Sequence, residues 1–213
     1  QTGGEIAAAG DLPKDQFLLT FEQNQFLELS MSQSSSFHKI HFISIGGSVM
    51  HNLAIELHLK GFAVTGSDDE IYEPSASRLA RYDLLPPVTG WFPEKVTEDL
   101  DAVILGMHAR QDNPELAKAR ELGIRVYSYP EYIFEQSQNK QRVVIAGSHG
   151  KTTITSMVLH VLKYNKRNFN YLVGAQIEGF DNMVRLSEDA PVIVISADAM
   201  PDDIERARVA GFT

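Results

Sequence analysis

Apolar runs alternate with amphipathic stretches along most of the chain. The run "KIHFISIGG" ends in glycines, and Met50, Leu53, Ala54 and Leu57 follow it at the i, i+3, i+4, i+7 spacing of a helix. Gly61 can end that helix in the left-handed conformation. The pattern therefore predicts a strand, a glycine turn and a helix in this order.

The same alternation continues for about a hundred residues. "FAVTGSDD" predicts a second strand, Pro74 precedes a short helix over 75–82, and "DAVILG" predicts a third strand. Asn113 and Pro114 supply an N-cap and a first-turn proline for the helix "PELAKARELG", and "IRVYSY" with "PEYIFEQ" completes the series. Strands joined by helices form a parallel sheet with right-handed crossovers, so residues 37–139 predict one Rossmann-like domain.

A polar stretch without periodicity, "EQSQNKQ", separates this series from a second one. The second series contains the strand "RVVIAG", an amphipathic helix, and the strands "YLVGA" and "PVIVIS". We therefore place a domain boundary between 37–139 and 140–213. Met31 is followed by a short polar segment and then by a predicted strand, which is typical of the first residue of a natural protein. We therefore expect residues 1–36 to be a non-native or disordered extension.

Residues 143–162, "VVIAGSHGKTTITSMVLHVL", place a glycine turn between a strand and a helix. Such a turn aims several backbone N–H groups at one point, where the positive end of the helix dipole adds to them. Gly147 and Gly150 allow close approach of a phosphate, Lys151 can reach the β and γ oxygens, and Thr152 can ligate Mg²⁺. The fold class predicted is thus α/β, with a Rossmann-like parallel-sheet domain followed by a truncated P-loop α/β domain.

Two features of this phosphate loop leave alternatives open. The full P-loop pattern has a glycine where Ile145 stands, so the turn could also be a glycine-rich turn that precedes a lysine in the first turn of a helix. His149 could contact a ligand or serve as a solvated spacer.

A second candidate turn, "ISIGGSVMHNLA", stands where a dinucleotide-binding fold places a phosphate. It does not spell GxGxxG, because Ser44 and Val49 occupy two of the glycine positions, and it could equally serve tight packing. Asp68, after the second strand, could bind a ribose hydroxyl or a base edge, or cap a turn. Both turns follow parallel strands, where α/β sheets bind ligands, which indicates two phosphorylated ligands.

Composition narrows the classes of function. The net charge is −9 with no long block of one sign, which argues against a nucleic-acid partner. No apolar run approaches the ~20 residues of a membrane helix, so no membrane partner is expected. The chain has no cysteine, which fits the reducing cytoplasm, where we expect the protein to act.

The motifs "HFISIGGSVMHNLA", "VTGSD", "DNPELAKARELGI" and "VVIAGSHGKTTITSMVLHVL", in this order, resemble the Mur ligases of peptidoglycan synthesis. Within that family the resemblance is strongest to murein peptide ligases and UDP-N-acetylmuramate–L-alanine ligases, and it covers roughly Phe37 to Ile195. It implies an N-terminal domain for a UDP-sugar, a central ATPase domain, and a C-terminal domain that delivers an amino acid or peptide.

The resemblance also implies roles for particular residues. Those implied to face the UDP-sugar phosphates are Gly46, Gly47, Ser48, Val49 and Met50, with Asp68 near the nucleoside. Those implied to hold ATP and Mg²⁺ are Gly147, Ser148, His149, Gly150, Lys151, Thr152 and Thr153, with Lys151 and Thr152 as catalytic residues.

The implied reaction joins UDP-N-acetylmuramate to an amino acid or murein peptide through an acyl phosphate, at the expense of ATP. Lys151 and Mg²⁺ would stabilise charge on the transferring phosphoryl group. The rival interpretations are a nucleotide-binding or regulatory module without catalysis, and an NAD-dependent oxidoreductase, which the missing GxGxxG disfavours.

The end of the chain departs from the family pattern. Ser196 takes the place of an expected glutamate, while Asp198 remains as a candidate Mg²⁺ ligand. Residues 192–213 resemble the fourth strand and helix of response-regulator receiver domains, with Ser196 in the position of their switch hydroxyl. The sequence lacks the acidic pair that follows the first strand of a receiver and leads to a phosphoacceptor aspartate, so we do not expect a working receiver. Because most of the ligase is missing, we expect this chain alone to be inactive or to bind weakly.

Overall fold

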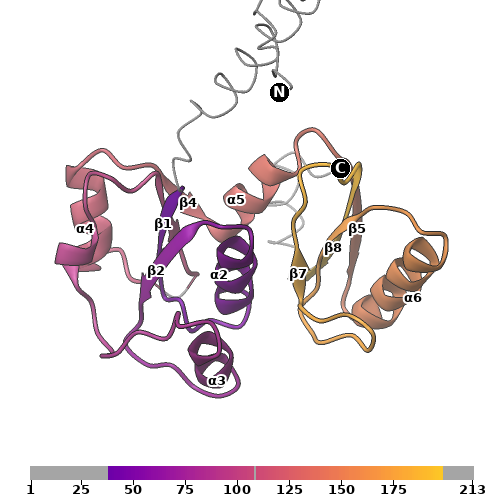
Figure 1. Cartoon of the computed structure of the whole chain (residues 1–213), viewed down its shortest axis with the longest axis horizontal. Coiled ribbons are helices and arrows are strands. Elements are labelled where there is room, and N and C mark those ends of the chain that lie inside the picture. The colour runs from indigo at the N-terminus through magenta and orange to yellow at the C-terminus, as the bar shows by residue number, and fades with distance from the viewer. Residues whose placement is uncertain (1–37, 108, 199–213) are drawn as a thin grey trace, which may run out of the picture. The chain divides into compact units, whose positions relative to one another are not determined.

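The structure is a computed structural model that describes residues 38–107 and 109–198. Its first sheet has the order β2-β1-β3-β4, with every neighbouring pair parallel. Figure 1 labels β1, β2 and β4 of this sheet. The strands are β1 (Lys39–Ile43), β2 (Ala63–Ser67), β3 (Ala102–Leu105) and β4 (Val126–Ser128). The prediction of a mixed α/β fold with a parallel Rossmann-like sheet is confirmed.

The predicted helices of the first series are all present. They are α2 (Met50–Leu59), α3 (Ser75–Ala80), α4 (Pro114–Glu121) and α5 (Tyr129–Gln136), and a 3₁₀ turn, η1 (Pro93–Lys95), is added. Gly61 follows α2 with φ +90°, as expected of a helix-ending glycine. The Asn113 side chain caps α4 by accepting the amides of Glu115 and Leu116 at 2.9 and 3.1 Å.

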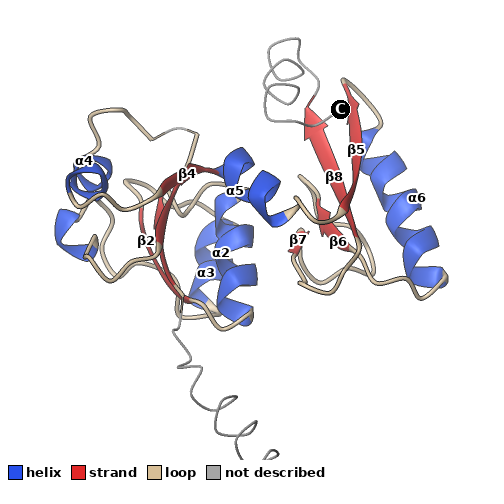
Figure 2. Cartoon of the chain, turned by 90° about the horizontal axis from the view of Figure 1, so that it is seen from above, coloured by secondary structure: helices blue, strands red, loops and turns tan. Residues whose placement is uncertain are grey.

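The helices cover both faces of this sheet (Figure 2). Phe42 and Ile104 belong to the buried cluster that includes side chains of α2 and α5, whereas Ile43 and Val103 pack with Leu116 of α4. Successive strand side chains point to opposite faces, so near-continuous apolar strands are what a sheet covered on both sides requires.

A buried polar pair ties β1 to α4. His41 and Glu115 are fully buried, with His41 Nε2 3.3 Å from Glu115 Oε2 and His41 Nδ1 2.8 Å from the Thr65 hydroxyl oxygen. Glu115 also accepts the Phe92 amide at 2.7 Å. Burial acts to raise the pKa of Glu115, but hydrogen bonds from His41, the Phe92 amide and the Ser67 hydroxyl outweigh it, so the pKa is lowered.

The second sheet has the order β5-β8-β6-β7. Its strands are β5 (Gln141–Gly147), β6 (Asn170–Leu172), β7 (Val184–Arg185) and β8 (Val192–Asp198), and α6 (Lys151–Tyr164) packs on β5 and β8 (Figure 1). β8 lies between β5 and β6 and is parallel to both, while β7 is antiparallel to β6.

The unusual tail of the sequence therefore begins as an integral strand. Within β8, Ser196 stands opposite Ile145 of β5. The proposed domain boundary falls in the turn between α5 and β5, and the division remains a proposal. The expected extension at 1–36 and the rest of the receiver-like segment, 199–213, lie outside the described residues.

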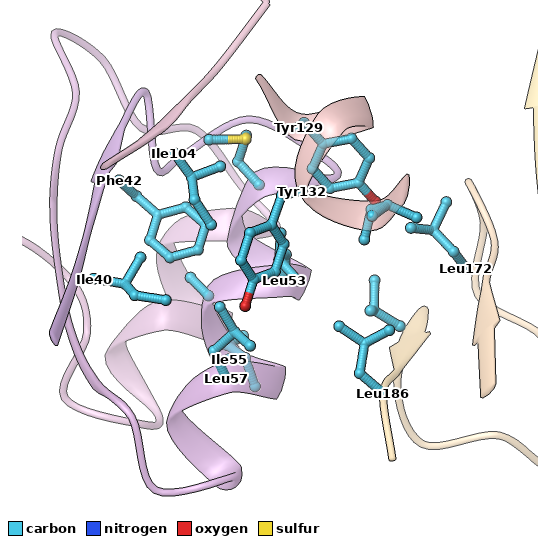
Figure 3. Packing of buried hydrophobic residues seen from close by; sticks show 14 of the residues in the cluster. Ile40, Phe42, Leu53, Ile55, Leu57, Ile104, Tyr129, Tyr132, Leu172 and Leu186 are labelled. Carbon is cyan, nitrogen blue, oxygen red and sulfur yellow. The ribbon is translucent and has the colours of Figure 1, made fainter. Parts of the chain in front are cut away.

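The second sheet also contacts α2. Leu172 and Leu186 belong to the same buried cluster as Leu53 and Leu57 of α2 (Figure 3). Glu56 of α2 accepts the amide of Leu186 at 2.7 Å, and burial raises the pKa of this carboxyl. Within the described ranges, no helix combines the length and apolar character needed to span a bilayer.

Candidate functional site

The first candidate turn links β1 to α2. Gly46 donates its amide to Asp68 Oδ2 at 2.7 Å, and a Cβ atom added at Gly46 would lie 2.9 Å from that oxygen. The turn begins at Ser44, which has φ +67° and donates its amide to the Ser67 carbonyl at 2.9 Å. A glycine at 46 is thus required for the close approach of the second strand's end.

Side chains of α2 hold the carbonyl groups of this turn. His51 Nδ1 donates to the Gly47 carbonyl at 2.8 Å, and Asn52 Nδ2 donates to the Ser48 carbonyl at 2.7 Å. Burial is the main cause that lowers the pKa of His51, and its Nε2 accepts Asn52 Nδ2 at 2.9 Å, so we assign a neutral imidazole with the proton on Nδ1. Within the described residues, the amides of Ser48 and Val49 make no hydrogen bond, which suits the binding of an anion.

A cavity of about 610 Å³ opens at this turn. Its walls are formed by Ser44, Gly46, Gly47, Ser48, Asp68, Asp69, Glu70, Tyr72, Glu73, Pro74, Ser75, Trp91, Arg110, Asp112, Asn113 and Pro114. Four predicted residues, Gly46, Gly47, Ser48 and Asp68, therefore line one cavity. Val49 and Met50 do not line it; the Met50 side chain is buried in the core, which leaves its backbone as the part that can face a ligand.

Sequence reasoning missed three lining residues with useful chemistry, namely Trp91, Arg110 and Asn113. The Trp91 indole offers a stacking surface. The Arg110 guanidinium is paired with Asp112 and can still contact an anion, and Asn113, whose Oδ1 caps α4, has its amide nitrogen left to donate. A signal was available, because Arg110 and Asn113 follow the third strand, whose carboxyl end adjoins that of the first in a parallel sheet.

Asp68 is both a structural group and a wall of the cavity. Burial raises its pKa to about 6, although the Gly46 amide acts in the opposite direction and Asp69 adds to the rise. The carboxylate thus caps the turn, which was one of the two roles considered for it. Its contact with a nucleoside remains a prediction.

The phosphate loop joins β5 to α6 and is held by its own backbone and lysine. Gly147 has φ +152° and Gly150 has φ +75°, conformations that L side chains rarely adopt. Lys151 Nζ donates to the Gly147 carbonyl at 2.8 Å and lies 3.5 Å from the Ser148 carbonyl oxygen. The ammonium group thereby spans the turn.

The loop is open at its surface. The side chains of Ser148, His149, Thr152 and Thr153 are exposed, and a Cβ atom added at Gly150 would have no neighbour within 4 Å. His149 Nδ1 lies 3.1 Å from the Ser148 hydroxyl oxygen. Within the described residues, the amides of His149 and Gly150 make no hydrogen bond. The loop is therefore open to solvent at Gly150, and Lys151 is the side chain that crosses it.

The predicted Mg²⁺ ligands are Thr152 and Asp198. Thr152 stands beside Lys151 in the first turn of α6, where its exposed hydroxyl fits one Mg²⁺ ligand, the others being phosphate oxygens and water. Asp198 ends β8, with its Cα opposite that of Gly147; its side chain lies outside the described atoms. Among the described residues, no group of three or more His, Asp or Glu side chains could hold a metal by itself.

Two α/β sheets, one Rossmann-like and one with a P-loop turn, define a nucleotide-binding class of α/β protein. Residues 39–141 match the sequence model described as "Mur ligase family, catalytic domain". The resemblance noted in the sequence is confirmed, and this part of the chain belongs to the Mur ligase family.

Relatives and solved structures agree with that assignment. The chain is 37% identical over 138 residues to the UDP-N-acetylmuramate–L-alanine ligase of Carboxydothermus hydrogenoformans, a match that covers 65% of this chain and 29% of the relative. It is 36% identical over 160 residues to the enzyme of that name from Lactiplantibacillus plantarum, covering 74% of this chain and 34% of the relative. The chain spans about a third of the length of the curated relatives it matches.

The fold matches two branches of the family. The murein peptide ligase of Neisseria meningitides superposes with a TM-score of 0.65 at 29% identity, over 76% of this chain and 52% of that one. The UDP-N-acetylmuramate–alanine ligase of Thermotoga maritima gives a TM-score of 0.61 at 29% identity, over 75% and 37% respectively. Both branches expected from the sequence are thus represented among the structural neighbours.

Proposed function

We propose that this chain is the UDP-sugar-binding and ATP-binding part of a Mur-type ligase, which joins an amino acid or murein peptide to UDP-N-acetylmuramate. The cavity at Gly46–Ser48 would take the diphosphate of the UDP-sugar, and Gly147–Thr153 would take ATP with Mg²⁺. The reducing environment expected from the absence of cysteine makes the cytoplasm its proposed location.

The observation that carries the ATP assignment is the contact of the Lys151 ammonium group with the carbonyl groups of its own loop. A lysine whose ammonium group spans an exposed glycine turn at a helix N-terminus is already placed to exchange two carbonyl contacts for phosphate oxygens. The exposed Thr152 beside it supports Mg²⁺ as the companion of the nucleotide.

In the proposed reaction, a carboxylate oxygen of the muramoyl group attacks the γ-phosphorus of ATP, and the bond to the β-phosphate oxygen breaks to release ADP. The amine nitrogen then attacks the acyl carbon, inorganic phosphate leaves, and the nitrogen loses a proton to give the amide. Lys151 would hold the β and γ oxygens in line and offset their charge, so its contribution is electrostatic and positional.

Ligation needs the amine donor held against the acyl phosphate, and loss of that alignment can remove several kcal/mol of catalysis. Since the chain spans about a third of its relatives, we propose that it binds both nucleotides and does not complete the reaction alone.

Titration calorimetry on the whole chain tests the proposal with three ligands: UDP-N-acetylmuramate, ATP with Mg²⁺, and NAD. We expect heat from the first two and none from NAD. Binding of NAD alone would favour an oxidoreductase, and binding of the UDP-sugar without ATP would favour a module without catalysis.

The matched variants are Lys151→Ala and Lys163→Ala, which remove lysines from opposite ends of α6. Lys151→Ala should weaken ATP binding at least tenfold, about 1.4 kcal/mol, and leave UDP-sugar binding within twofold. Lys163→Ala should change neither affinity. Equal losses of ATP affinity in both variants would refute the assignment of Lys151.

A further inference from the structure

A chain of side-chain contacts leads from the first turn to the second sheet through α2 and α3. Asn52, which holds the Ser48 carbonyl, accepts Arg78 NH1 through its Oδ1 at 3.3 Å. The other guanidinium nitrogen, NH2, donates to Gln176 Oε1 at 3.3 Å. Gln176 lies in the segment between β6 and β7, so one arginine joins a residue that supports the turn to a loop of the P-loop sheet.

Asn52 also contacts that segment directly. Its Nδ2 lies 3.4 Å from Met183 Sδ, in addition to the bond to Ser48. Asn52 is buried, with 4% of its surface exposed, so these contacts are not traded freely for water. One turn further along α2, Glu56 accepts the Leu186 amide at 2.7 Å, and the two residues bind the same stretch of chain, 183–186.

None of Asn52, Arg78 and Gln176 lines the cavity at the first turn. Their contacts end on the Ser48 carbonyl, which belongs to a residue that does line it. A planar guanidinium that bonds two amide oxygens at once constrains both in orientation and distance. Through Asn52, Arg78 can therefore affect the binding of a ligand at the turn without contacting that ligand.

We propose that Arg78 is a positioning residue which couples the glycine turn of the UDP-sugar cavity to the 176–183 loop of the P-loop sheet through Asn52 and Gln176. This inference rests on the proposed function for its ligand, but the coupling is a property of the chain itself. Because coupling is reciprocal, a ligand at the turn stabilises the loop by the same free energy with which the loop stabilises the bound turn.

The contacts of Arg78 make a purely structural role separable from this one. A structural residue lowers the stability of the fold when it is removed and leaves the affinity of the folded protein unchanged. If Arg78 is a positioning residue, a substitution in the distant loop that removes one of its partners also disturbs the turn. Gln176→Ala is therefore the informative variant, because Gln176 is exposed and lies outside the cavity.

The first experiment is hydrogen–deuterium exchange of the whole chain without ligand. Gln176→Ala and Arg78→Ala should each raise deuterium uptake of peptides covering residues 46–52 by twofold or more in rate. Glu178→Ala, an exposed change in the same loop, is the control and should leave those peptides unchanged. Unchanged uptake at 46–52 in both Arg78→Ala and Gln176→Ala would overturn the proposal, whether or not any nucleotide binds.

The second experiment measures the affinity for UDP-N-acetylmuramate. Arg78→Ala and Gln176→Ala should each raise Kd about three- to tenfold, the double variant should resemble either single one, and Arg78→Lys should be intermediate because an ammonium group cannot form the same fork. Failure of the unaltered chain to bind the UDP-sugar would count against the proposed function, and the exchange experiment would still decide the coupling. Binding by the unaltered chain with an unchanged Kd in both alanine variants would overturn the coupling.

Discussion

The two glycine turns are shaped by different means. The turn after β1 is held by buried groups: Asp68, from the end of the second strand, accepts the Gly46 amide, and His51 and Asn52, each four residues further along in α2, hold the carbonyls. The turn after β5 is exposed and is shaped by two glycines with positive φ and by Lys151, its neighbour in sequence.

The first turn is therefore preorganised for its ligand, whereas the second can adapt to one. A turn with buried partners keeps its shape whether or not a ligand is present, which reduces the entropy lost on binding. A turn held by its own lysine must give up those contacts to a phosphate, and it can adjust as it does so. Under the proposed function, the first arrangement would suit the UDP-sugar, which stays bound through the reaction, and the second would suit a nucleotide that changes from ATP to ADP.

The largest difference in stability between the two regions is expected when one methyl group is added to each, at Gly66 beside the first turn and at Gly150 in the phosphate loop. A Cβ atom at Gly66 would lie 2.5 Å from Cδ1 of the fully buried Ile45, so Gly66→Ala should lower the free energy of unfolding by about 3 kcal/mol through overpacking. Gly150→Ala meets no neighbour and should cost about 1 kcal/mol from its positive φ. Urea denaturation followed by circular dichroism measures both, and equal losses would remove the contrast between the regions.

A smaller effect is expected from the charge buried at the first turn. The folded pKa of Asp68, raised by burial to about 6 from 3.8, means that the native state binds this proton more tightly than the unfolded chain. Stability therefore falls as pH rises between about 4 and 6. Asp68→Asn mimics the protonated acid, so at pH 7 it should be more stable than the unaltered chain by about 2 kcal/mol, with little difference at pH 4.

Urea midpoints at half-unit steps from pH 4 to 7 measure this effect. The control is Asp181→Asn, which changes an exposed carboxyl in the second region. Parallel pH curves for Asp68→Asn and the unaltered chain would show that Asp68 is ionised as easily in the fold as outside it.

The smallest effect on stability is expected from a substitution in α6, the helix that follows the phosphate loop. The Thr155 hydroxyl in α6 is fully buried and makes no hydrogen bond within the part of the chain that the structure describes. Thr155→Val keeps the shape and removes the unsatisfied group, so it should raise the free energy of unfolding by up to about 1 kcal/mol without altering ATP affinity. Thermal unfolding checks the first part and calorimetry the second, with Thr89→Val, which lies outside both candidate sites, as the exposed control. A loss of stability would mean that the hydroxyl is bonded in solution.

The sequence was a good guide to what depends on neighbouring residues. Periodicity located α2 and α6, Asn113 marked the start of α4, and the candidate phosphate loop was recognisable because its glycines and lysine lie within one short stretch, 147–151. The order of the strands in the second sheet was not predictable, since nothing local indicates that β8 enters between β5 and β6.

The first site was harder to predict than the second for the same reason. Trp91 and Arg110 reach the cavity from loops far along the chain, and the support that His51 and Asn52 give to the turn depends on burial that periodicity does not reveal. Met50 continues the motif in sequence, yet its side chain packs into the core, because a helix turns successive residues to different faces.

The place of β8 has a consequence for synthesis on the ribosome. Lys39 pairs with Ala63, so the first sheet can begin to form soon after α2 emerges. Gln141 pairs with Val192, and among the described strands β5 has no other neighbour. Because translation proceeds from the N-terminus, the strand that leads into the phosphate loop must wait for some fifty further residues before it gains a partner, so the nucleotide turn is completed late in the nascent chain.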